Sequence, residues 1–172
     1  MVTEVTDGRG RRSDRAFERL ADYVYGTIAT LVAILGLTFD THPDALTAGA
    51  VIIVGAVAIW LAHGLSQLVA ERSRQAGSMP LADIVAEFRT SWPIVSAAVP
   101  ATLVMLMAEF GVYSTSTGLG IAQIVGVLAL AGVGVATAGG SKRPVVRRIG
   151  YVALVTGVGV LIVVMEAAAH SL

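Results

Sequence analysis

Three polar residues recur at every fourth position of an otherwise apolar stretch, Leu46 to Arg74. They are His63, Gln67 and Glu71, and residues four apart share one face of a helix. His63 lies 17 residues beyond Leu46, a descent of about 25 Å along a helix. A neutral imidazole there binds a metal or relays protons, with Gln67 and Glu71 continuing the path. The alternative is a buried histidine that makes one hydrogen bond to a neighbouring helix.

Two carboxylates fall inside segments that we expect to cross a membrane. Glu109 follows Pro93 by 16 residues and Glu166 follows Gly150 by 16, so each lies about 24 Å along its helix. Both are therefore expected in the outer third of the bilayer, where burying a charge costs about 3 kcal/mol. If adjacent, they would share a proton or hold a cation. The alternative is that each is a separate, wetted acid at the outer interface.

Motifs of hydrolytic and phosphoryl-transfer enzymes are missing from the sequence. It contains no HExxH, GxSxG or GxxxxGK[ST] motif, and no paired aspartates inside the apolar segments. The absence of cysteine excludes thiolate metal sites and thiol catalysis. The three histidines, at positions 42, 63 and 170, are expected on different faces of the membrane, which disfavours a three-histidine metal site. We expect that the protein is not an enzyme, and the residues name no cofactor, metal or substrate.

The composition is that of a membrane protein. Of 172 residues, 55% are hydrophobic and 14% charged, whereas about a quarter of the residues of a soluble domain are charged. The formal net charge is zero, so total charge predicts no nucleic-acid partner. The first apolar run is too long for the core of a cleaved signal peptide, and no small-residue cleavage site follows it before Asp40.

Five apolar segments have about the 20 residues that a helix needs to cross a bilayer. The sequence predicts an all-α fold with a single transmembrane domain over residues 16–170, preceded by a disordered cytoplasmic tail, 1–15. The expected spans are residues 22–39, 45–69, 92–113, 118–138 and 149–169.

The connector at 70–91 contains a short amphipathic helix. Within residues 81–88, apolar side chains occur at 81, 84, 85 and 88, which places them on one helical face. We expect this helix at the cytoplasmic surface or against the spans. Trp60 and Trp92 are predicted interface anchors. Pro100 is predicted to kink its helix or to leave backbone carbonyls open to a neighbour.

The positions of the basic residues predict the orientation of the chain. All 12 Lys and Arg residues fall in three places: the N-terminus through position 19, the 70–91 connector, and residues 142–148. None lies in 40–44, in 114–117 or after Arg148. With five spans these three places share one side, which the positive-inside rule makes cytoplasmic. We therefore expect a multi-pass protein of the cell membrane with its N-terminus inside and its C-terminus outside.

This plan resembles the vacuolar iron transporter family. Val24-Tyr25-Gly26 is similar to the Val-Tyr-Gly that opens that family's first span, and residues 97–100 (Ala-Ala-Val-Pro) resemble its proline-containing third helix. The small residues of 132–140, the basic connector and the glycine-bearing last span are similar to its closing pair. Small integral membrane proteins of high-GC bacteria also look similar, through residues 24–28 and 60–63. The family's metal-lining acid after Val-Tyr-Gly has no counterpart in residues 27–30.

Two functions from different classes follow. The first is a divergent carrier that moves a cation or small solute along a route containing His63, Gln67 and Glu71. The second is a non-transporting scaffold or accessory subunit that keeps the fold without the metal ligands. The resemblance implies a homodimer, and small-residue faces at Gly26 and at 132–138 agree with it. The expected partners are thus the lipid bilayer and a second copy of the chain.

Overall fold

The computed structural model describes residues 4–39, 44–74, 81–139 and 145–169, and every element in these ranges is helical. The described ranges contain seven helices. They are α1 (Glu4–Thr38), α2 (Ala45–Arg74), α3 (Leu81–Thr90), α4 (Pro93–Ser96), α5 (Val99–Glu109), α6 (Thr115–Gly139) and α7 (Val145–Ala169). The all-α prediction is therefore confirmed for the described part of the chain.

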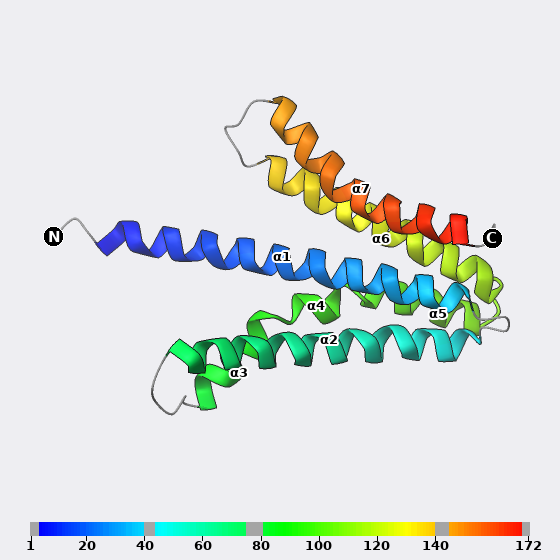
Figure 1. The fold of residues 1–172 in the computed structure, drawn as a ribbon, viewed down its shortest axis with the longest axis horizontal. Helices are drawn as coiled ribbons and strands as arrows, with labels where there is room; N and C mark the ends of the chain where they lie inside the picture. Colours follow the sequence, from blue (N-terminus) through cyan, green and yellow to red (C-terminus); the bar gives the residue numbers. More distant parts are fainter. Residues whose placement is uncertain (1–3, 40–43, 75–80, 140–144, 170–172) are drawn as a thin grey trace.

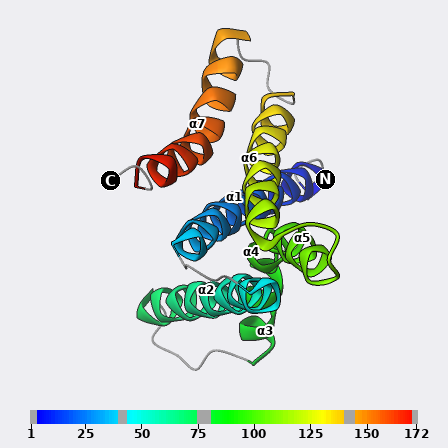
Figure 2. The ribbon, with the colours of Figure 1, turned by 90° about the vertical axis from the view of Figure 1, so that its right-hand side faces the viewer.

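The long helices run back and forth along one axis. In Figure 1, α1 and α7 run from left to right while α2 and α6 run from right to left, and the α3–α5 series again runs to the right. The N-terminal end of α1 and the C-terminal end of α6 thus lie at the same end of the bundle as α3. Figure 2 shows α7 on one side of α6 and α5 on the other.

Three helices are long and apolar enough to cross a membrane within the described ranges: Ala16–Thr38, Ala45–Glu71 and Thr115–Thr137. A bent pair, Ile84–Ser96 with Val99–Glu109, makes a fourth when it is counted as one span. In α7 the apolar stretch among the described residues is shorter, Val152–Met165. This is the build of a multi-pass membrane protein with three or four membrane-length helices among the described residues, against the five expected.

The predicted span at 92–113 is broken into two helices. Residues 97 and 98 interrupt it, and the two arms of the bent pair meet at 47°. Pro100 has no N–H to give to the carbonyl of Ser96, which favours a bend at this position. The predicted kink at Pro100 is confirmed. The helical part ends at Glu109, before Gly111 adopts a φ of +76° that glycine tolerates.

Helix α1 extends further toward the N-terminus than the sequence predicts. It begins at Glu4 and has 35 residues, so that the segment expected to be a disordered tail is helical from residue 4 onward. Extending a helix that already exists requires no new nucleation, which is one physical reason for the difference.

The core lies where α1, α2, α5 and α6 meet. Most of its buried members are alanines, including Ala48, Ala98 and Ala122, and they pack with Met105 and the fully buried Ile34. Small residues let neighbouring backbones approach closely, which is how helices pack in lipid. Outside the core, large apolar side chains remain exposed on every long helix, as expected of surfaces that face acyl chains.

The amphipathic helix predicted at 81–88 is confirmed as α3, and it packs against α2. The indole N–H of Trp60 donates a hydrogen bond to the carbonyl oxygen of Phe88 at 3.0 Å. The rings of Trp60 and Phe88 meet edge-on, with centroids 5.2 Å apart. Trp92 completes the cluster at 5.7 Å from Trp60, and 53% of its surface is exposed, in keeping with the anchor predicted there.

Candidate functional site

An acid and an imidazole meet between the first two long helices. Nε2 of His63, on α2, lies 3.6 Å from Oδ1 of Asp22, on α1. The two side chains are 27% and 15% exposed, respectively. At 3.6 Å the contact is longer than a hydrogen bond, whose N···O distance is about 2.7–3.2 Å. The two groups are therefore close enough to interact electrostatically, and a small movement would bring them within hydrogen-bond distance.

Both groups belong to membrane-length helices, Ala16–Thr38 and Ala45–Glu71. Asp22 precedes Thr38 by 16 residues, about 24 Å along α1, and His63 follows Ala45 by 18, about 27 Å along α2. Measured from the Thr38 and Ala45 ends of these two antiparallel helices, the positions agree, so both groups lie toward the other ends of the apolar segments. A titratable pair within membrane-length helices is costly to maintain and marks a functional candidate.

Two further α1 residues act on the pair. The phenol ring of Tyr25 lies beside the imidazole, with centroids 6.1 Å apart and planes tilted by 39°, and 52% of Tyr25 is exposed. Glu18, one turn before Asp22, adds negative charge that acts on the Asp22 carboxylate. The site is thus acidic toward the N-terminal end of α1, and the exposed ring of Tyr25 borders it.

This arrangement suits a proton or a single cation. A carboxylate and an imidazole this close together are groups that proteins use to pass on a proton or to hold a cation. No group of three or more histidine and carboxylate side chains stands ready to hold a metal ion in the described ranges. Any metal here would have two protein ligands, His63 and Asp22, and would need others from water or substrate.

The remaining members of the predicted stripe continue along α2. Gln67 is exposed and Glu71 is half-buried, one and two turns beyond His63. The hydroxyl of Ser66 donates to the His63 carbonyl at 2.7 Å, within the same helix. The stripe runs from the Asp22–His63 pair toward the C-terminal end of α2, and its role as a path stays a prediction.

The two predicted outer carboxylates come from helices on different sides of the bundle. Glu109 is the last residue of α5 and is exposed. Glu166 belongs to α7, and its side chain lies outside the described part of the structure. In Figure 2, α5 and α7 stand on opposite sides of α6. The coupling of these two carboxylates stays a prediction.

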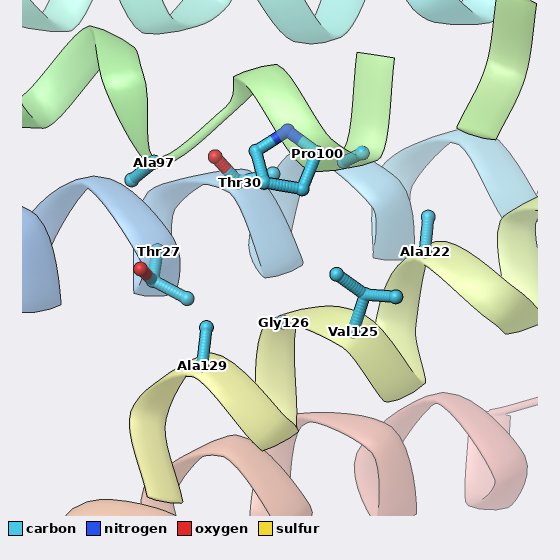
Figure 3. A pocket seen from close by; sticks show the side chains of 9 residues that line it. Thr27, Thr30, Ala97, Pro100, Ala122, Val125, Gly126 and Ala129 are labelled. Atoms are coloured by element: carbon cyan, nitrogen blue, oxygen red, sulfur yellow. The ribbon is translucent and has the colours of Figure 1, made fainter. Parts of the chain in front are cut away.

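A small cavity lies at the break between α4 and α5 (Figure 3). Its volume is about 10 Å³, near the lower limit for one water molecule. The hydroxyls of Thr27 and Thr30 lie at its edge and donate to carbonyls of their own helix at 2.8 Å. The lining comes from three helical regions: Thr27, Thr30, Ala97, Pro100, Ala101, Ala122, Val125, Gly126 and Ala129. In this conformation the cavity is too small for a solute.

Sequence reasoning placed Asp22 only at the start of the span predicted at 22–39 and missed it as a partner of His63. A signal was available, because Glu18, Asp22 and Gly26 recur every fourth residue. That spacing predicts an acidic face next to a close helix contact. What the sequence did not contain was the rotation of α1 about its axis, which decides where this face points.

Comparisons of the chain with protein-family models, curated proteins and solved structures found no match.

Proposed function

We propose that this protein is an integral membrane carrier that moves a proton or another cation, and that Asp22 and His63 form its central binding site. The observation that carries the proposal is the 3.6 Å contact between these two side chains, at matching positions in membrane-length helices. Gln67 and Glu71 continue the route toward the cytoplasmic end of α2. The fold is proposed to be a divergent form of the vacuolar iron transporter plan.

In the proposed topology the chain crosses the cell membrane five times, and its N-terminus lies in the cytoplasm. The alternating directions of the long helices support it (Figure 1). Arg89 belongs to the last turn of α3 and Arg147 to the first turn of α7, and these helix ends lie at the same end of the bundle as the N-terminal end of α1 (Figure 1). Basic residues favour the cytoplasmic side. Helix α7, with 25 residues, is about 37 Å long, enough to serve as the fifth crossing.

A homodimer is proposed on the exposed small residues of α6. Of the glycines expected at a dimer contact, Gly26 and Gly134 already pack against residues of the same chain, Ile94 and Val152 respectively. Gly132, by contrast, meets nothing within 4 Å and is exposed. The dimer would therefore use the outer face of α6 rather than Gly26.

The alternative function is a membrane scaffold or accessory subunit that transports nothing. The specific observation in its favour is the packed interior at the break between α4 and α5, where the cavity measures only about 10 Å³. A carrier needs a second conformation that widens this region or another. A scaffold does not.

Ion flux in proteoliposomes separates the two functions. Purified protein is reconstituted into vesicles, and uptake of protons and of several monovalent and divalent cations is compared with that of protein-free vesicles. A carrier gives flux that His63→Gln abolishes and that Thr137→Val leaves unchanged, because the Thr137 hydroxyl donates to carbonyls of its own helix in α6. Flux equal to that of empty vesicles for every ion would reject the carrier and favour the scaffold.

A further inference from the structure

Each of the two helices that hold the Asp22–His63 pair carries a glycine, and the segment between α2 and α5 packs closely against both glycines. On α1, Gly26 stands one turn from Asp22, and a methyl group there would come within 2.8 Å of Ile94 Cα in α4. On α2, Gly64 directly follows His63, and a methyl group there would come within 2.8 Å of ring atoms of Phe88 in α3. The α3–α4 segment, Leu81–Ser96, thus contacts both helices of the pair beside the pair itself.

This segment is fixed at both contacts. On the α2 side, the indole of Trp60 binds the Phe88 carbonyl at 3.0 Å and packs edge-on against its ring. On the α1 side, Ile94 is fully buried. Between them Ser91 is 2% exposed, and its hydroxyl donates to the carbonyl of Glu87 at 3.2 Å.

We infer that the α3–α4 segment is a positioning element, which sets the separation of Asp22 and His63 through its contacts with Gly26 and Gly64. Helices in lipid are held by such close packing rather than by hydrophobic force between them. Moving Phe88 away from Gly64 shifts or rotates α2 against α1, and the 3.6 Å contact lengthens. The role of this element in transport rests on the proposed function, whereas its effect on the pair does not.

The groups that face the imidazole come mainly from α1. They are the Asp22 carboxylate and the Tyr25 ring, with Glu18 acting on Asp22. Helix α4 contributes no titratable residue. On α3, Glu87 and Arg89 flank Phe88 in the sequence, so a test that replaces Phe88 alone leaves these charges in place.

A size exchange at the Gly64–Phe88 contact tests the inference. Gly64→Ala adds a methyl group that collides with the Phe88 ring, and Phe88→Leu removes the ring atoms that it meets. Gly55→Ala is the matched control in the same helix, because nothing lies within 4 Å of that position. The readout is the pair of imidazole ¹⁵N resonances of His63 in reconstituted protein, assigned by their loss in His63→Gln.

We expect Gly64→Ala to shift these resonances toward those of Asp22→Asn. The double variant Gly64→Ala/Phe88→Leu should restore the wild-type values, and Gly55→Ala should leave them unchanged. Unchanged resonances in Gly64→Ala, or no restoration in the double variant, would overturn the inference. If Gly64→Ala does not fold, Trp60→Phe replaces it, since it removes the hydrogen bond to Phe88, and an unshifted spectrum then overturns the inference equally. If the resonances behave as expected but the wild type carries no ion, only the carrier proposal fails.

Discussion

Replacing Gly26 by alanine should force α1 and α4 apart. The added methyl carbon would stand 2.8 Å from Ile94 Cα and closer still to the Ile94 carbonyl oxygen, whereas ordinary contact begins at 3.4 Å. The helices must therefore separate by at least about 0.6 Å. The obstacle is backbone, which cannot rotate away as a side chain would. Overpacking of this kind costs about 1–3 kcal/mol. At roughly 2–4 °C per kcal/mol for a chain of this size, the midpoint of thermal unfolding should fall by several degrees.

The matched control is Gly36→Ala in the same helix, where nothing lies within 4 Å. Both variants gain helix propensity, up to about 1 kcal/mol, so the difference between them isolates the collision with Ile94. Tryptophan fluorescence in mild detergent follows the unfolding, because Trp92 adjoins α4. If the midpoint of Gly26→Ala equals that of Gly36→Ala, α1 and α4 do not approach each other as closely as described, and α4 cannot position Asp22.

Three other predictions concern stability, topology and assembly. Thr47 donates its backbone N–H and its hydroxyl to the Asp44 carboxylate, at 2.9 and 2.8 Å, and these bonds lower the pKa of Asp44 below its ordinary value of 3.8. The stability that these bonds confer is present above pH 3.8 and is lost as the pH falls through the folded-state pKa. Asp44→Ala should therefore destabilise the protein at pH 7 and have no effect in acid. An equal loss of stability at both pH values would contradict this. In the cysteine-free chain, a membrane-impermeant thiol reagent applied outside should label a cysteine at Thr115 but not one at Lys142, and labelling of Lys142→Cys would refute the topology. Light scattering in mild detergent should give a dimer that Gly132→Leu dissociates, whereas a wild-type monomer without cross-links in native membranes would contradict the α6 contact.

The helices were predictable from the sequence because apolar length and helix breakers are local properties. The boundaries near Ala45 and Leu81 agree closely with the expected ones, since a proline or an aspartate precedes each. The bend at Pro100 was predictable for the same local reason. The start of α1 was not, because a polar segment that extends an existing helix pays no new nucleation cost.

The site was less predictable, because it depends on rotation and adjacency. Spacing places His63, Gln67 and Glu71 on one face of α2, yet says nothing about which helix that face meets. The contact with Asp22 follows from α1 packing beside α2 and from the close approaches at Gly26 and Gly64. Equal depth likewise told nothing about whether α5 and α7 are neighbours, and Figure 2 shows them on opposite sides of α6.

The most direct test of the central claim is a double-variant cycle on ion flux through proteoliposomes, with Asp22→Asn, His63→Gln and the two combined. If the two side chains form one binding site, each single variant abolishes the flux that the wild type supports, and the double variant is no worse than either. Single variants with partial losses that multiply in the double variant would show two independent residues, and would contradict a shared site between α1 and α2.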